Sequence, residues 1–187
     1  MQAKLNLHAT ENRSRANGPG VRYVVWFQGC DLGCPGCFNP DTHNSEPKTI
    51  TAIGALVDDI VHQGDAIEGV TLSGGEPFQQ LASMSKLLET IRARTALSVL
   101  IFTGYTMTEL ERMPGADAAL ANVDVLVAGR YIESKPLGKE LRGSSNQRVH
   151  LLTDRYTMAD IERVPTTEVR IDPSGLVTLT GVDPLDL

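Results

Sequence analysis

Three cysteines, Cys30, Cys34 and Cys37, restrict this chain more than any of its other residues do, because they lie within eight positions of one another. The chain has no other cysteine, and an odd number of thiols so closely spaced cannot form a disulfide framework. The same loop contains residues that favour tight turns: Gly29, Gly33, Pro35 and Gly36. A loop of this composition can bend until three thiolates face one point. The C-x3-C-x2-C spacing therefore predicts that the cysteines hold an inorganic centre.

Two kinds of inorganic centre fit this spacing. A structural zinc ion needs a fourth ligand, which His43 can supply. A [4Fe–4S] cluster normally has four cysteine ligands, so three would leave one iron free to bind a substrate or cofactor. The remaining interpretations are an electron-transfer cluster with an unrecognised fourth ligand, or thiols grouped by chance. The spacing favours the cluster with an open iron, which would be a reaction centre.

The composition of the chain is that of a globular protein with one core. It has 187 residues, of which 41% are hydrophobic and 21% charged. A net charge of −6 gives no general attraction to nucleic acid or to anionic lipid. The apolar runs are shorter than the roughly 18 residues of a membrane-spanning helix, and the first twenty residues lack a secretory signal. We therefore expect a cytoplasmic protein without nucleic-acid or membrane partners.

The spacing of apolar residues predicts strands that alternate with helices. Strands are predicted at these ranges: 22–28, 69–72, 97–102, 124–127 and 149–152. One helix is predicted to begin at Thr49 and end at Gly64, and a second to begin at Pro77. A capping box at Thr106 and Glu109 predicts a third, shorter helix.

This alternation implies parallel strands joined by right-handed crossovers. Five such units are too few for a closed eightfold barrel, so we expect the α/β class with a partial, open βα barrel over residues 1–152. Residues 133–148 are polar and predict a long loop. Residues 153–187 predict an extension packed on the same domain, with a short helix and a hairpin of strands 168–171 and 176–180. In such folds, chemistry collects at the C-terminal ends of the strands.

Two motifs at corresponding points of this pattern carry a family resemblance. The cysteine triplet follows the first predicted strand, and Gly-Gly-Glu-Pro at 74–77 follows the second. Together they resemble the radical S-adenosylmethionine enzymes. Further segments are similar to the activating proteins of anaerobic ribonucleotide reductases: 17–22, 27–40, 72–77, 103–105 and 142–147. The resemblance covers about residues 5–152, with Ala128 in place of the family's aspartate and with an extension after His150.

The resemblance implies the activity and the cofactors. It implies a [4Fe–4S] cluster on Cys30, Cys34 and Cys37, with S-adenosylmethionine at the iron that they leave free. It also implies an oxidoreductase that cleaves this cosubstrate reductively and removes hydrogen from a glycine of a partner glycyl radical enzyme, the large subunit of anaerobic ribonucleotide reductase. A low-potential donor such as flavodoxin or ferredoxin would supply the electron. The side chains and backbone expected at the cofactor are those of Phe38, Ser73, Gly74, Gly75, Glu76, Ser145 and Asn146.

The residue chemistry agrees with these roles without requiring them. Gly74 and Gly75 permit close approach of a ligand, and Glu76 offers acceptors to the amino group of the cosubstrate. The simpler interpretation is a glycine turn before a helix that begins with proline. Phe38 can shield the cluster, or it can be a core aromatic side chain.

Two rival functions stay open. A radical S-adenosylmethionine enzyme can act on a small molecule, with the C-terminal extension closing the pocket. A zinc-stabilised binding module needs no cosubstrate. Iron and sulfide content separates the zinc module from the enzymes, and a requirement for a partner protein separates the two enzymes.

Overall fold

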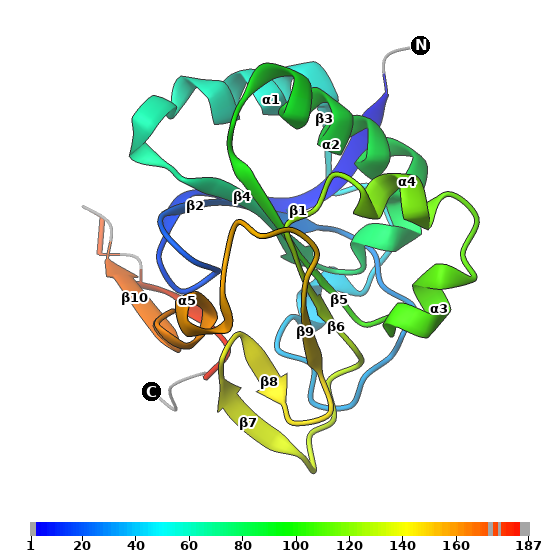
Figure 1. Ribbon diagram of the computed structural model, residues 1–187, viewed down its shortest axis with the longest axis vertical. Helices are drawn as coiled ribbons and strands as arrows, with labels where there is room; N and C mark the ends of the chain where they lie inside the picture. The colour runs from blue at the N-terminus through cyan, green and yellow to red at the C-terminus, as the bar shows by residue number, and fades with distance from the viewer. Residues whose placement is uncertain (1–2, 172–173, 176, 184–187) are drawn as a thin grey trace.

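The computed structural model describes residues 3–171, 174–175 and 177–183. Within these residues, the centre of the molecule is an open sheet of seven strands (Figure 1). In sheet order the strands are β3 (Thr49–Ala52), β1 (Lys4–Ser14), β2 (Arg22–Phe27), β4 (Gly69–Gly74), β5 (Ser98–Thr103), β6 (Val125–Ala128) and β9 (Arg148–Leu151). Strands β2, β4, β5 and β6 are parallel. Strand β1 is antiparallel to both of its neighbours, and β9 is antiparallel to β6.

Helices cover one face of the sheet. They are α1 (Ile53–His62), α2 (Leu81–Arg94), α3 (Met107–Glu111) and α4 (Ala116–Leu120). Their apolar residues share one core with alternate residues of three parallel strands: Tyr23, Val25, Val70, Leu72, Val99 and Ile101. Each buried aliphatic side chain of this core contributes roughly 1.5–3 kcal/mol. Helix α3 begins with the capping box that the sequence predicts.

The opposite face of the sheet has a smaller apolar cluster and leaves room for a site. Leu100, Val125 and Val127 pack there against Leu141 and the extension residues Ile161 and Val164. Figure 1 shows the covering elements on this side, which are β7 (Pro136–Lys139), β8 (Arg142–Ser144) and α5 (Met158–Glu162). Side chains of β2 and β5 that alternate with the helix-facing ones line a cavity on this face.

The α/β class is confirmed, but several predicted elements are wrong. The sequence does not predict β1, because only Leu5 and Leu7 of its eleven residues are buried and apolar. Residues 49–52 pair with β1 as an edge strand, so α1 begins at Ile53 and not at Thr49. The predicted loop 133–148 contains the β7–β8 pair. Strand β9 runs antiparallel because that pair, and not a crossover helix, returns the chain to the sheet.

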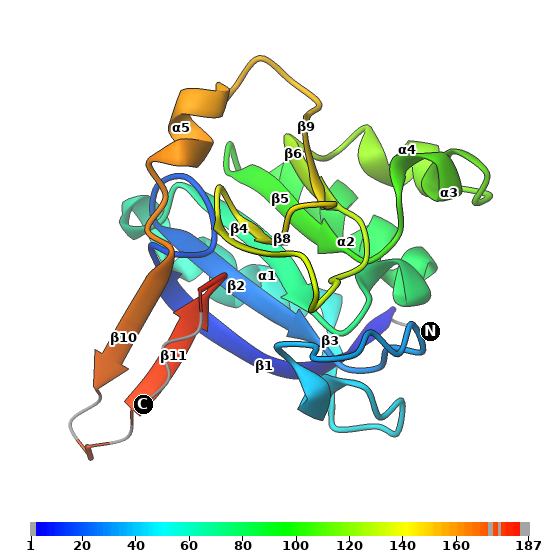
Figure 2. The same ribbon diagram turned by 90° about the horizontal axis from the view of Figure 1, so that it is seen from below.

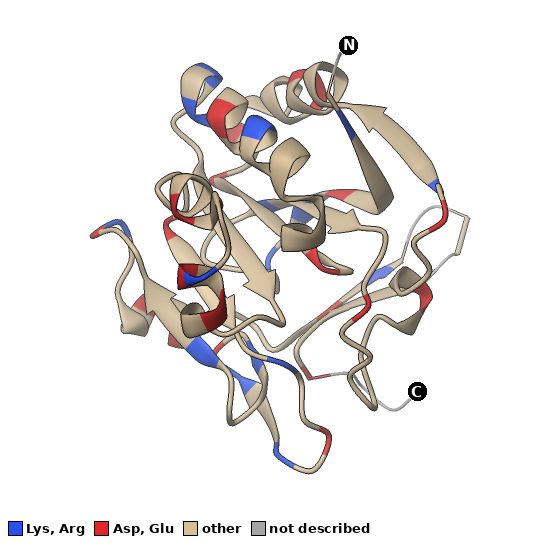
Figure 3. Ribbon diagram, turned by 90° about the vertical axis from the view of Figure 1, so that its right-hand side faces the viewer, with Lys and Arg blue, Asp and Glu red and all other residues tan. Residues whose placement is uncertain are grey.

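The C-terminal extension forms the expected helix and hairpin. Strand β10 (Thr167–Ile171) pairs with β11 (Val177–Gly181), and residues 172–173 and 176 of the predicted hairpin lie outside the described residues. Figure 2 shows the hairpin projecting from the sheet beside β1 and β2. Acidic and basic residues are interspersed along the ribbon in the view of Figure 3. None of the helices in the described ranges is long and apolar enough to cross a membrane.

Candidate iron–sulfur and cosubstrate site

A cavity of about 470 Å³ opens at the C-terminal edge of the parallel strands. Segments that end or follow four successive parallel strands line it: Cys30 after β2, 73–76 at β4, 103–104 at β5, and Gly129 after β6. The ends of parallel strands meet at one edge of a sheet. The topology therefore brings together the segments that the sequence places at strand ends.

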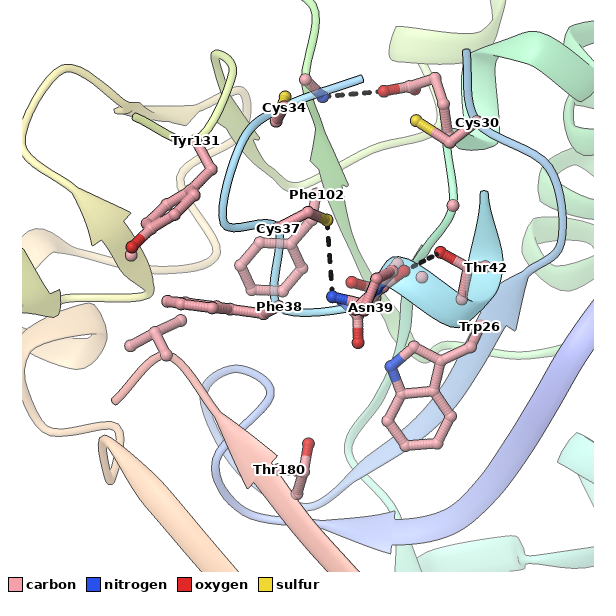
Figure 4. Close-up of a pocket in the computed structure, with 18 of the residues that line it drawn as sticks. Trp26, Cys30, Cys34, Cys37, Phe38, Asn39, Thr42, Phe102, Tyr131 and Thr180 are labelled. Atoms are coloured by element: carbon pink, nitrogen blue, oxygen red, sulfur yellow. Dashed lines mark hydrogen bonds between the residues drawn. The ribbon is translucent and has the colours of Figure 1, made fainter. Parts of the chain in front are cut away.

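All three cysteines lie on the loop that follows β2, and all three line the cavity (Figure 4). The loop has positive φ angles at Gly29 (104°), Gly33 (59°) and Gly36 (69°), which other residues rarely adopt. Its first residues are fixed by hydrogen bonds from Gly29 N–H to Thr42 O at 2.7 Å and from Cys30 N–H to His43 O at 3.1 Å. The glycines thus give the loop the sharp turns that the sequence predicts.

The chemistry of the three thiols fits an iron–sulfur cluster. Burial raises the pKa of the Cys30 and Cys37 thiols, and negative charge on Cys34 raises both further. Thiolates this close repel one another, and a positively charged metal centre removes both the repulsion and the cost of burial.

A single zinc ion and a four-iron cluster require different arrangements of their ligands. Among the described residues, no three His, Cys, Asp or Glu side chains converge as one metal ion requires. A four-iron cluster distributes its ligands over several metal atoms.

The Gly74–Gly75 turn packs against the start of the cysteine loop. Gly75 N–H donates to Phe27 O and Glu76 N–H to Gly29 O, both at 2.9 Å. A Cβ atom on Gly75 would lie 2.3 Å from Gly29 O, and one on Gly74 would lie 2.7 Å from Phe27 N. Side chains are therefore excluded at both positions, and the backbone of the turn lines the cavity beside Ser73.

Glu76 is buried, with 1% of its surface exposed, and its carboxylate joins two loops. Its Oε1 accepts hydrogen bonds from Phe78 N–H at 3.0 Å and Thr103 Oγ1 at 2.9 Å, and its Oε2 accepts one from Gly104 N–H at 2.8 Å. Burial raises the pKa of Glu76 to about 7, although these donors and the charge of Arg130 oppose the shift. A cation placed beside this carboxylate would stabilise its charged form.

Aromatic side chains surround the cysteine loop. Figure 4 shows Trp26, Phe38, Phe102 and Tyr131 around it, and all four line the cavity. Phe38 and Tyr131 are in contact, with ring centroids 4.6 Å apart. Phe38 is 39% exposed, so it is not a core residue. These side chains border the cysteines, and shielding of the cluster by Phe38 stays a prediction.

The structure does not bring every expected residue to this cavity. Asn146 lies on a second, smaller cavity with Arg130, Arg148 and His150. Its amide donates to Arg130 O at 2.8 Å, and its Oδ1 is buried without a hydrogen-bond partner among the described residues. The Ser145 side chain is exposed, and its N–H donates to Lys135 O. Contacts of these two residues with a cofactor stay a prediction.

Several cavity residues carry no sequence signal. Trp26 and Phe102 lie in the predicted strands 22–28 and 97–102, and no motif of the sequence assigns a role to His8. The hairpin adds the largest group: Thr167, Thr178, Leu179, Thr180, Gly181 and Val182. These residues are more than 120 positions from the cysteine loop. Contacts between segments so distant in the chain leave no local sequence pattern. For Trp26 and Phe102, the one available signal is the alternation of side chains between the two faces of a strand.

Comparison with known proteins supports the same chemistry. Residues 16–150 match the family described as a 4Fe-4S single cluster domain. The chain is 32% identical over 142 residues to the anaerobic ribonucleoside-triphosphate reductase-activating protein of Enterobacteria phage T4, covering 74% of this chain and 88% of that protein. It is 33% identical over 155 residues to the protein of the same name from Escherichia coli K12, covering 79% and 99%.

A second kind of relative matches a shorter region. The pyruvate formate-lyase-activating enzyme of Staphylococcus epidermidis is 37% identical over 95 residues, which are 48% of this chain and 38% of that enzyme. The matched domain and the relatives named as activating enzymes define an iron–sulfur enzyme of the radical S-adenosylmethionine class. The chain belongs to the family of anaerobic ribonucleoside-triphosphate reductase-activating proteins. Its cofactors are a [4Fe–4S] cluster and S-adenosylmethionine.

Proposed function

We propose that this chain installs the glycyl radical on the large subunit of an anaerobic ribonucleoside-triphosphate reductase. One observation carries the proposal: a single cavity contains the three cysteines and the turn at 73–76. Relatives named as activating proteins of that reductase match this chain over 88% and 99% of their lengths. A glycyl radical enzyme is thus the class of partner, and the reductase is the particular partner that we propose.

We assign the site as follows. Cys30, Cys34 and Cys37 ligate the cluster. When bound, the reduced cluster supplies one electron to S-adenosylmethionine, which yields methionine and, after removal of one glycine hydrogen, 5′-deoxyadenosine. The backbone of Gly74 and Gly75, which lines the cavity, lies against the cosubstrate.

Glu76 has a double role in this proposal. Three of the lone pairs of its carboxylate are used by protein donors, which hold the turn next to the loop at 103–104. Its remaining acceptor capacity and its charge suit the amino group of the cosubstrate. Phe38 shields the cluster together with Tyr131.

The architecture is part of the same proposal. We assign residues 1–152 to a partial barrel of the radical S-adenosylmethionine type and residues 153–187 to an extension packed on it. The open sheet with four parallel strands supports this assignment. We further propose a cytoplasmic location and a low-potential electron donor such as flavodoxin or ferredoxin.

The test is radical transfer under anaerobic conditions. Reduced protein, S-adenosylmethionine and the reductase large subunit should together give a glycyl doublet in electron paramagnetic resonance. The doublet should collapse to a singlet when the target glycine is α-deuterated. Conversion of a small metabolite without any partner protein, and without a doublet on the reductase, would replace this proposal with the small-molecule alternative.

A further inference from the structure

The C-terminal hairpin of β10 and β11 has one apolar face and one polar face, and its polar face is the one turned toward the protein. Directly opposed pairs in its register are Val169 with Leu179 and Ile171 with Val177. Because side chains alternate along a strand, these four residues share one face, which we call the hairpin's apolar face. The other face carries polar residues: Glu168, Arg170, Thr178 and Thr180. In most antiparallel sheets with one solvated face, the apolar face packs on the core.

Here the polar face is the one that contacts the body of the protein. Glu168 Oε2 accepts from Ser14 Oγ at 2.6 Å and from Arg15 N–H at 3.0 Å. Asn17 Nδ2 donates to Thr180 Oγ1 at 2.7 Å. Arg170 donates to Arg13 O at 2.9 Å and forms an ion pair with Glu11.

These contacts leave the apolar face exposed. Ile171 is 70% exposed, Val169 and Val177 are each 48% exposed, and Leu179 is 38% exposed. A single exposed aliphatic residue needs no explanation, but four on one face of one hairpin form a contiguous apolar surface. The hydrogen bonds of the polar face orient the hairpin so that its apolar face is exposed to solvent.

The apolar face adjoins the rim of the site. Leu179 belongs to that face and also lines the cavity that contains the cysteines. Its neighbour Thr180 points from β11 toward the cavity in Figure 4. Phe38, the exposed aromatic residue of the cysteine loop, lines the same cavity. A polypeptide that reaches the cysteines over this rim would pass the exposed side chains of Leu179 and Phe38.

The proposed radical transfer indicates which molecule binds to the hairpin's apolar face. Hydrogen abstraction requires the Cα of a glycine in another protein to enter the cavity, so that protein must lie over the rim. The matched family region ends at residue 150, so the hairpin lies outside the part of the chain that matches the family. We propose that the hairpin's apolar face is a docking surface for the glycyl radical enzyme, and that it binds apolar side chains near the target glycine. The inference rests on the proposed function.

The experiment titrates the reductase large subunit against full-length activase and records the glycyl doublet. Ile171→Ser with Val177→Ser removes the opposed pair at the exposed end of the hairpin. This variant should need about tenfold more reductase for a half-maximal signal, with an unchanged maximum, as expected for the loss of interface anchors. Its iron content and its cleavage of S-adenosylmethionine without reductase should equal those of the wild type.

Matched variants separate docking from other effects. Ile50→Ser with Val61→Ser changes side chains that are 50% and 38% exposed on β3 and α1, and it should titrate like the wild type. Ile171→Leu with Val177→Ile keeps the apolar surface and should also titrate like the wild type. Hydrogen exchange in residues 167–181 should slow when the reductase is added.

Each contrary result has a distinct meaning. Wild-type protein that installs no radical on the reductase refutes the proposed partner, and this inference with it. A wild-type doublet with the same titration for the serine variant refutes the docking surface alone. A wild-type dimer in analytical ultracentrifugation that the serine variant abolishes would assign the face to a second copy of this chain, and would also refute the proposal.

Discussion

The carboxylate of Glu76 connects the turn at 73–76 with the loop at 103–104. Its partner Thr103 lies 27 residues further along the chain. It is buried, and burial raises its pKa to about 7, so its charge is maintained by the donors around it and by any cation that binds beside it. At this scale, one side chain both builds the cavity and offers it a negative charge. A substitution that removes the charge and keeps most of the contacts tests the second role.

Glu76→Gln keeps one carbonyl oxygen for Phe78 N–H and Thr103 Oγ1, but it removes the charge and the acceptor of Gly104 N–H. We expect the dissociation constant of S-adenosylmethionine to rise roughly 10- to 100-fold, because a charge-assisted hydrogen bond is lost. Cluster content should stay near that of the wild type. Isothermal titration calorimetry under anaerobic conditions measures the affinity, and Glu109→Gln, on the partly exposed pair with Arg130, is the control. Unchanged affinity would make Glu76 a structural residue.

The cysteines give a second prediction at the residue scale. Replacing Cys30, Cys34 or Cys37 with Ala should abolish or destabilise the cluster, because in the proposed site each ligates a different iron. His43→Ala should leave the cluster intact, since the described contact of His43 with the loop is through its backbone carbonyl. Iron and sulfide analysis after anaerobic reconstitution should give near four of each for the His43 variant. Loss of the cluster in that variant, or one zinc without sulfide in the wild type, would contradict the assignment.

At the scale of elements, Asp124 fixes the positions of β5, β6 and α2 relative to one another. Its Oδ2 accepts from Arg92 Nη2 and from Val99 N–H, both at 2.7 Å, and its Oδ1 accepts from Thr153 Oγ1 at 2.9 Å. Burial alone would raise the pKa of Asp124, but these donors outweigh burial and lower it. Because the folded state holds this carboxylate charged, its contribution to stability is present above the ordinary pKa of about 3.9. It is lost as the pH falls through the lower folded value.

Asp124→Asn should therefore reduce the free energy of unfolding by about 1–3 kcal/mol at pH 7. The difference from the wild type should shrink below about pH 4, where protonation removes the wild-type advantage. Urea unfolding followed by circular dichroism across this pH range is the measurement. Asp58→Asn, on the exposed pair with Arg94, should change stability by less than about 1 kcal/mol at every pH. A constant difference between Asp124→Asn and wild type down to pH 3 would show that charge is not the cause.

At the scale of the whole molecule, the part of the extension around α5 packs into the core. Ile161 is fully buried in the cluster with Leu100 and Val125. The hydroxyl of Tyr156 lies 2.7 Å from Ser98 Oγ and 3.4 Å from the guanidinium of Arg22. Burial lowers the pKa of Arg22 to about 10, and Tyr156 opposes this shift. A buried guanidinium needs all of its hydrogen bonds, so the extension helps to keep Arg22 charged inside the protein.

Two truncations should consequently behave differently. Removal of residues 167–187 takes away the hairpin but leaves Ile161 in place, so cluster assembly and cooperative unfolding should persist. Removal of residues 153–187 also takes away Ile161, whose loss alone costs roughly 2–5 kcal/mol, and it uncovers Arg22. The shorter chain should lose cooperative thermal unfolding in calorimetry. If it unfolds at the same temperature as the chain that lacks only the hairpin, the extension is dispensable for the fold.

The sequence by itself determined what depends on residues close together in the chain. The cysteine loop, the Gly-Gly-Glu turn, the capping box of α3 and the parallel core strands all have local patterns, because turn chemistry and apolar periodicity act over a few residues. Only the tertiary structure decided what depends on partners far along the chain. Strand β1 exists because β2 and β3 pair with it, β9 is antiparallel because of the path of β7 and β8, and Thr180 reaches the cavity through its contact with Asn17. Such pairings are selected by the fit of whole surfaces, for which a single stretch of sequence carries no signal.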